Sequence, residues 1–217
     1  MGVSVVAKPG NAFTNGILFR RMSAIFLLCC SAVVVDAGPL PAAQEAGASI
    51  VAAARRQVGK TLYYDPAYTR IAYPMGDVPI ETGVCTDVII RALRDALKMD
   101  LQQLVHKDMA AAFSEYPQNW GLKTPDPNID HRRVPNLRKY FSRMGFSLKV
   151  TENPEDYLPG DIVSCMLPGN IPHIMIVSDK KAGDGAPLAI HNIGGGAKEE
   201  DCLFYFSITG HYRVKVK

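Results

Sequence analysis

The feature of this sequence that most constrains its fold is a change in the spacing of apolar residues near Gly145. Before it, apolar residues recur every three or four positions over 49–58, 85–97 and 134–144, which predicts three amphipathic helices. After it, short runs rich in β-branched and aromatic residues predict strands; they are "FSLKV", "DIVSCML", "HIMIVSD", "PLAIHNI" and "FYFSITGHYRVKV". This order indicates an α+β fold, with N-terminal helices packed on a C-terminal antiparallel sheet.

The first 37 residues have the order of a secretory signal peptide. Arg20 and Arg21 precede a short apolar run, and the small residue Ala37 ends the segment. The run is shorter than the roughly 20 residues that span a bilayer. An uncleaved membrane anchor is the alternative, and translation could also begin at Met22. We expect export to the periplasm or cell envelope, with no stable membrane span after cleavage, and a flexible lead-in over 38–48.

Composition excludes some classes of function. The chain has 217 residues, of which 47% are hydrophobic, and this suits one globular domain, which we place at 49–217. The net charge is only +3, and no dense run of Lys and Arg accompanies it. Nucleic-acid binding therefore has little support. We expect no cofactor.

Three cysteines follow the expected signal peptide: Cys85, Cys165 and Cys202. In an oxidising compartment an odd number leaves one thiol free or paired with another chain. Cys165 and Cys202 could form a disulfide that leaves Cys85 free. Alternatively, all three are buried, reduced thiols, and the sequence leaves both arrangements open.

Cys85 stands where the turn in "TGVCTDVIIRAL" becomes a helix. A thiol attacks as the thiolate, and a free cysteine with a pKa near ~8.5 is mostly protonated at neutral pH. Unpaired N–H groups and the dipole at a helix N-terminus favour the anion, and they could also stabilise an oxyanion. Cys85 is therefore a candidate nucleophile. A buried core cysteine is the alternative, because free cysteines are often buried.

Two histidines could assist such a thiol. His173 opens the run "HIMIVSD", and His191 lies in the next expected strand. If these strands pair as a hairpin, His191 could reach His173 and fix its tautomer, whereas Asn192 points to the opposite face. Structural histidines are the alternative. Elsewhere, Asp130 and His131 belong to "NIDHRRVP" and could, with the arginines that follow, bind an acidic substrate or form a solvated helix start.

Two long irregular stretches separate the expected helices. The first, from Leu62 to Gly83, contains four tyrosines, and the second, from His106 to Asp130, contains the single tryptophan, Trp120. Loops of this length in compact domains are usually functional or disordered, and the tyrosines argue against disorder.

The motifs together resemble known families. "YLPGDIVSCML", "PHIMIVSD" and "AIHNIGGG", following a cysteine at a helix start, look like the NlpC/P60 and CHAP group of papain-like hydrolases. "GVCTDVIIRALR", "DLQQLVHKDM" and "NIDHRRVPNLR" more closely resemble the DUF1287 family over about 63–214. The resemblance implies a papain-like, NlpC/P60-type fold. It also implies Cys85 as nucleophile, His173 as base and His191 as the residue that orients the base.

The same resemblance implies a function. NlpC/P60 relatives mostly cut peptide bonds of the cell wall, so we expect an exported cysteine amidase or peptidase acting on peptidoglycan stem peptides. The expected substrate-binding residues are Tyr64, Tyr73, Asp87, Asp130, His131 and Arg132. One alternative is a non-catalytic module of the same fold that binds cell wall or protein. Another is a zinc site formed by the cysteine and the two histidines, although the sequence has no short-range ligand pair such as CxxC.

Overall fold

The structure is a computed structural model that describes residues 42–216. Its helices are α1 (Ala42–Arg55), α2 (Cys85–Leu97), α3 (Leu101–Ala111) and α4 (Val134–Arg143). The strands of its main sheet are β3 (Ser147–Leu148), β4 (Ile162–Leu167), β5 (Ile171–Lys181), β6 (Pro187–Asn192), β7 (Ala197–Glu200) and β8 (Ser207–Tyr212). Two further strands, β1 (Tyr63–Tyr64) and β2 (Thr82–Gly83), pair in parallel. The predicted α+β fold, with helices before the sheet, is confirmed.

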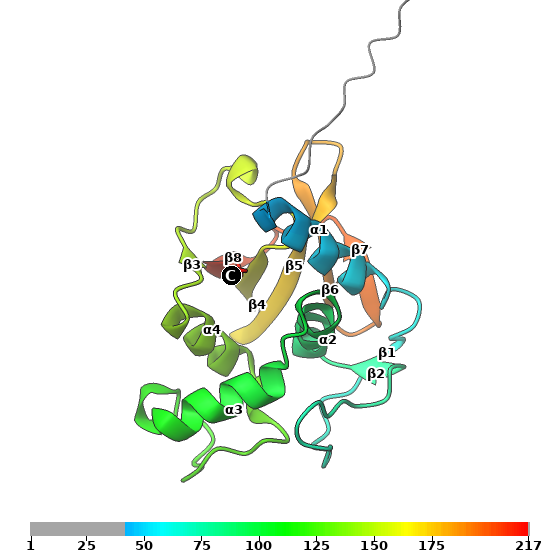
Figure 1. The fold of residues 1–217 in the computed structure, drawn as a ribbon. Coiled ribbons are helices and arrows are strands. Elements are labelled where there is room, and N and C mark those ends of the chain that lie inside the picture. The colour runs from blue at the N-terminus through cyan, green and yellow to red at the C-terminus, as the bar shows by residue number, and fades with distance from the viewer. Residues whose placement is uncertain (1–41, 217) are drawn as a thin grey trace, which may run out of the picture. The chain divides into compact units, whose positions relative to one another are not determined.

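The six-stranded sheet is antiparallel in the order β3-β8-β4-β5-β6-β7. Figure 1 shows α1 and α2 lying across one face of it, in front of β5 and β6. Alternate residues of the strands face different cores, as the pleat requires. Ile174, Ile176 and Ile190 pack with the helices, whereas Met175 and Val177 pack on the other face against Tyr157 and Leu203.

The segment 1–37, which we expect to be a signal peptide, lies outside the described residues. The lead-in expected over 38–48 is wrong in its second part, because α1 already begins at Ala42. "AAQEAGAS" carries no apolar periodicity but contains alanine, the strongest helix former. Tertiary packing also stabilises this first part of α1. Gly47 lies so close to Pro159 that a Cβ on it would be only 2.3 Å from the Pro159 carbonyl oxygen. Among residues 42–216, no helix is long and apolar enough to cross a membrane.

Two other expectations need correction. The stretch expected to be irregular from His106 onward begins inside α3, which continues to Ala111 and buries Leu101, Val105 and Met109. The strand β7 was not expected, since "AKEE" is short and charged. Charged residues are common on edge strands because they discourage pairing with other chains.

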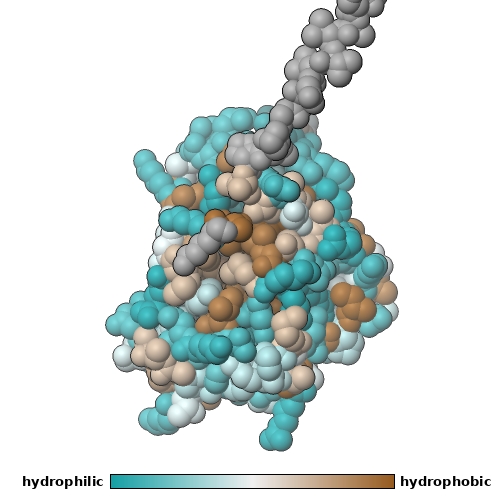
Figure 2. Space-filling view, viewed as in Figure 1, coloured by the Kyte–Doolittle hydropathy of each residue, from teal (hydrophilic) through white to brown (hydrophobic). Residues whose placement is uncertain are grey.

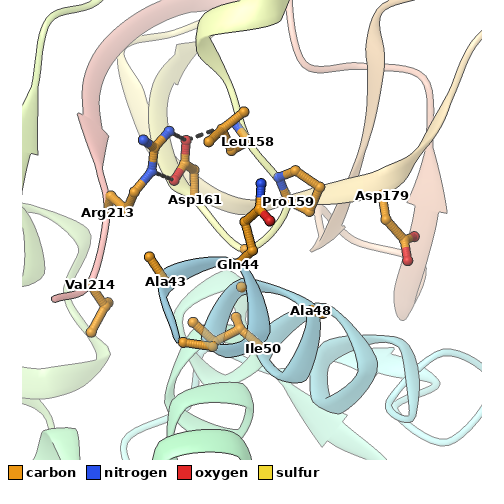
Figure 3. A pocket seen from close by; sticks show the side chains of 13 residues that line it. Ala43, Gln44, Ala48, Ile50, Leu158, Pro159, Asp161, Asp179, Arg213 and Val214 are labelled. Carbon is orange, nitrogen blue, oxygen red and sulfur yellow. Dashed lines mark hydrogen bonds and ion pairs between the residues drawn. The ribbon is translucent and has the colours of Figure 1, made fainter. Parts of the chain in front are cut away.

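A hollow of about 280 Å³ lies between α1 and the turn that leads into β4. Figure 3 shows Ala43 and Ile50 on one side of it and Leu158 and Pro159 on the other. Figure 2, which has the same view as Figure 1, shows apolar side chains gathered near the middle of the visible face. At its edge Asp161 accepts hydrogen bonds from the Leu158 N–H and from Arg213. None of the lining residues is a cysteine, serine or histidine, so the candidate chemistry lies elsewhere.

Candidate active site

Cys85 is the first residue of α2, and the predicted helix start is confirmed. Asp87 fixes this start: its carboxylate accepts the Val84 N–H at 2.7 Å, the reciprocal half of a capping box. Asp87 also forms a two-point ion pair with Arg132, in which both N···O distances are 2.9 Å. The Cys85 side chain is therefore held by a helix terminus whose first turn is itself anchored to a neighbouring segment.

Cys85 is only 4% exposed. Burial raises its pKa to about 12, although hydrogen bonds from the backbone N–H groups of Ile174, Thr86 and Cys85 itself act in the opposite direction. At pH 7 the raised pKa favours the neutral thiol, and the three backbone N–H groups favour the thiolate that forms when the proton leaves. The donor from Ile174 also places the sulfur one residue from His173.

His173 and His191 contact each other as predicted. Their Nε2 and Nδ1 atoms lie 2.8 Å apart, and both side chains are buried. On its other side, His191 Nε2 lies 2.9 Å from a carboxylate oxygen of Glu200 and 3.4 Å from the sulfur of Cys202. Asn192 points to the opposite face, also as predicted, and donates to the carbonyl oxygens of Gly83 and Tyr63.

The contact with Glu200 determines which ring nitrogens of His191 and His173 carry a hydrogen. A carboxylate only accepts, so His191 Nε2 carries a hydrogen and its Nδ1 is an acceptor. The His173 Nε2–H then donates to His191 Nδ1, which leaves His173 Nδ1 with a free lone pair. Burial lowers the pKa of His173 to about 3, with a further contribution from His191. The imidazole is therefore neutral at pH 7, and its Nδ1 lone pair is available to accept a hydrogen bond.

Within residues 42–216, the Cys85 thiol and the His173 imidazole are not hydrogen-bonded to each other. In the described chain the His173 imidazole bonds to His191, and the contacts of the thiol are backbone N–H groups and Tyr64. Strand alternation directs His173 to the side of Met175, whereas Cys85 packs in the same core as Ile174. In this structure the two side chains therefore lie on opposite faces of β5, and His173 does not line the pocket that contains Cys85. Catalytic hydrogen bonds are often long in substrate-free enzymes and tighten when substrate binds.

A pocket of about 440 Å³ opens over Cys85. Its apolar wall includes Val84, Ile129, Val134 and Ile171. Its lining side chains with polar or aromatic groups are Tyr64, Cys85, Asn119, Trp120, Arg132 and Arg133. The N-termini of α2 and α4 both reach this pocket, through Cys85 and Val134.

Of the two tyrosines expected at the site, only Tyr64 lines the pocket. Burial raises the pKa of its hydroxyl to about 12, and contact with the Cys85 thiol adds to the rise. Tyr73 lies elsewhere: its ring packs edge-to-face against His106, with ring centroids 5.2 Å apart. The expectation that Tyr73 lines the site is therefore not met by the structure.

Asp87, Asp130 and His131 do not line the pocket either, because all three side chains are buried in contacts within the protein. Asp130 accepts hydrogen bonds from the Asp126 N–H and from Arg133. Burial, together with the charge of Arg132, lowers the pKa of His131 to about 4. Among the residues expected to bind substrate, the structure brings Tyr64 and Arg132 to the pocket, whereas Tyr73, Asp87, Asp130 and His131 do not line it.

Trp120 was not among the expected site residues, yet it lines the pocket, together with Arg133, the second of the two arginines that follow His131. The guanidinium carbon of Arg133 lies 4.0 Å from the centroid of the Trp120 ring. A tryptophan in a long irregular stretch was the available signal, because aromatic residues on loops often belong to binding sites.

Cys85, Cys165 and Cys202 are all buried free thiols, so the alternative of three reduced cysteines is the one the structure shows. Within residues 42–216, no group of three or more His, Cys, Asp or Glu side chains is placed to hold a metal ion. Cys85, His173 and His191 therefore do not form a zinc site in this arrangement.

Comparison with known proteins places the chain in a family. The model of DUF1287, described as a domain of unknown function, matches residues 51–214. An uncharacterised protein of Escherichia coli strain K12, YijF, is 59% identical over 169 residues, which cover 78% of this chain and 82% of the relative. Among solved structures, NlpC1 from Trichomonas vaginalis matches with a TM-score of 0.41 and 14% identity. That match covers 82% of this chain and 47% of the other, so this chain spans about half of its length.

Proposed function

The chain belongs to the DUF1287 family, and we propose that it is a cysteine amidase or peptidase. In this proposal Cys85 is the nucleophile, His173 the general base and His191 the residue that orients the base. The observation that carries the proposal is the Glu200–His191–His173 chain of hydrogen bonds, which leaves a lone pair on His173 Nδ1. His173 directly precedes Ile174, the strand residue whose amide contacts the Cys85 thiol. A base held by a third group beside a nucleophile is the general pattern of nucleophilic catalysis.

The proton states favour one form of the mechanism. Cys85 is a neutral thiol and His173 a neutral imidazole in the substrate-free protein, because burial disfavours both charges. We infer that substrate binding brings the His173 imidazole to the thiol, and that the thiol then loses its proton to His173 as the sulfur attacks the amide carbonyl. The imidazolium then protonates the leaving amine, and the neutral imidazole activates a water that hydrolyses the thioester. The N–H groups of Cys85 and Thr86, at the start of α2, are the donors for the negative charge.

The substrate class in this proposal is the peptidoglycan stem peptide, reached after export. It follows from the resemblance of the "PGD", "PHIMIVSD" and "AIHNIGGG" motifs to NlpC/P60 hydrolases. The pocket volume, about 440 Å³, is within the range of small-ligand sites and accommodates a few peptide residues.

A second candidate function is a binding module of the same fold that lacks catalysis. The 4% exposure of Cys85 and the separation of its thiol from the His173 imidazole favour it. In that case the pocket binds a peptide, and Cys85 contributes only to packing.

The test is release of peptides from purified peptidoglycan, followed by chromatography and mass spectrometry. We expect the wild-type protein to release fragments with new peptide termini, and Cys85→Ala and His173→Ala to lower the rate at least about 100-fold. Cys165→Ala is the matched control, because it removes a buried thiol from the other core. Equal release by wild type and Cys85→Ala would refute the proposal. Binding without release, in all variants, would establish the binding module.

A further inference from the structure

The pocket over Cys85 presents cationic and dipolar groups without an acidic side chain of its own. Among its described lining residues, Arg132 and Arg133 carry charge, and no aspartate or glutamate is present. The N-termini of α2 and α4 also reach it. Helix N-termini favour anions because their first N–H groups lack partners within the helix. Arg132 and Arg133 are the charged side chains that could contact such an anion.

The hydrogen-bond donors of Arg132 are already used by contacts within the protein. Its Nε and Nη2 atoms donate to the two oxygens of Asp87, and its side chain is only 3% exposed. Weaker contacts reach the carbonyl oxygens of Ala67 and Asp65. The favourable interaction with Asp87 outweighs the cost of burial, so the pKa of Arg132 lies above its usual value. Arg132 therefore shapes the pocket and offers little to a ligand.

Arg133 differs in each of these respects. One N–H group donates to Asp130 at 3.1 Å, and no other hydrogen bond of this guanidinium forms within residues 42–216. A guanidinium has five N–H donors, so one of its edges is still available. For Arg133, burial outweighs the favourable contributions of Asp130 and Asp126, and its pKa lies below its usual value. An additional anionic partner would offset that cost.

Arg133 is also held in place before any ligand binds. Its guanidinium stacks over the Trp120 ring at 4.0 Å, and Asp130 fixes one end. Asp130 in turn is buried and accepts the Asp126 N–H. Stacked and anchored arginines lose little conformational entropy when they bind a carboxylate with two parallel hydrogen bonds.

We propose that Arg133, stacked on Trp120 at the N-terminus of α4, is the specificity residue of the pocket and binds a free carboxylate of the peptide substrate. Arg133 and Cys85 line the same pocket, so this carboxylate belongs to the peptide whose amide bond is cleaved. The role in cleavage rests on the proposed hydrolase function, whereas the binding itself does not. The substrate class becomes an acidic peptide rather than a neutral or amidated one.

The test uses two forms of one probe, the stem tripeptide L-Ala–γ-D-Glu–meso-diaminopimelate with free and with amidated carboxylates. Binding is measured by isothermal titration calorimetry to the full chain carrying Cys85→Ala, which prevents turnover. We expect the free form to bind at least about tenfold more tightly. Arg133→Gln should abolish the preference, and raising the salt concentration should weaken it. Arg143→Gln, on the same helix but paired with Asp108 outside the pocket, should keep it.

Circular dichroism checks that each variant is folded. If Arg133→Gln does not fold, Trp120→Phe serves instead, because it weakens the stacking and leaves the Asp130 contact in place; it should reduce the preference about threefold. Equal binding of the two tripeptides, or an unchanged preference in Arg133→Gln, would overturn the proposal. Wild-type hydrolysis of both tripeptides at equal rates would overturn it while leaving the hydrolase function intact. A binding preference without any hydrolysis would support it and refute the hydrolase function.

Discussion

The ion pair between Asp87 and Arg132 is predicted to be the contact on which the start of α2 most depends. Both side chains are almost fully buried, and both guanidinium-to-carboxylate distances are 2.9 Å. Asp87 also accepts the Val84 N–H at 2.7 Å. Asp87→Ala would leave the charge of Arg132 buried without a partner, at a cost of about 3–5 kcal/mol. The lost cap adds about 1 kcal/mol.

The expected loss is therefore about 4–6 kcal/mol in the free energy of unfolding, a large share of the roughly 5–15 kcal/mol typical of a domain. Urea unfolding at pH 7, followed by circular dichroism, measures it. Asp95→Ala is the control, since Asp95 pairs with Arg56 where both side chains are more than half exposed. That change should cost under about 1 kcal/mol. The double variant Asp87→Leu with Arg132→Met should lose less than Asp87→Leu alone.

A loss below about 1 kcal/mol for Asp87→Ala would refute this account of the helix start. If the two side chains are coupled, Arg132→Met costs less stability in the Asp87→Leu variant than in the wild-type protein. An equal cost in both proteins would refute the coupling.

Three further predictions concern the buried histidines and thiols. The pKa of His131 is lowered to about 4, so the unfolded chain takes up a proton between about pH 6.5 and 4 that the folded protein does not. Stability should fall as the pH drops through this window, by roughly 3 kcal/mol from this group, and urea unfolding of His131→Asn should show a shallower fall. His191→Ala should lower kcat about 10–100-fold in the peptide-release assay. Glu200→Gln should lower it less, because the Glu200 side chain is 41% exposed. Equal rates in the wild type and both variants would contradict the role of His191 in orienting His173. Ellman's reagent should titrate the thiols of Cys165 and Cys202 only after unfolding, without prior reduction, whereas a requirement for a reducing agent would indicate a disulfide.

The sequence was sufficient for those parts of the fold that rest on periodicity. The apolar stripe after Cys85 and the stripe from Val134 predicted α2 and α4, because each helix buries one face. The contact between His173 and His191 followed from hairpin pairing of adjacent strands. The early start of α1 could not be read in this way, because an alanine-rich turn has no periodicity and gains its stability from packing.

The site was less predictable because sequence shows which side chains are polar but not which are already paired. Asp87, Asp130 and His131 were reasonable ligands by type, and the structure uses all three inside the protein. Arg132 and Arg133 are neighbours in sequence and both line the pocket, yet Arg132 is paired with Asp87, whereas the Arg133 guanidinium makes one hydrogen bond within the described residues. Such differences depend on long-range contacts, since the partner of Arg132 lies 45 residues away.

The central claim is that Cys85 is a nucleophile whose proton goes to His173. The most direct measurement is the rate of iodoacetamide labelling of each cysteine in the folded protein from pH 5 to 10, mapped by mass spectrometry. The account predicts that Cys85, which lines the pocket, labels before Cys165 and Cys202, and that His173→Ala slows its labelling at least about tenfold near pH 7.5. His106→Ala, outside the site, should leave the rate unchanged. Labelling of Cys85 only on unfolding, at a rate indifferent to His173, would contradict the claim and leave a core cysteine beneath a binding pocket.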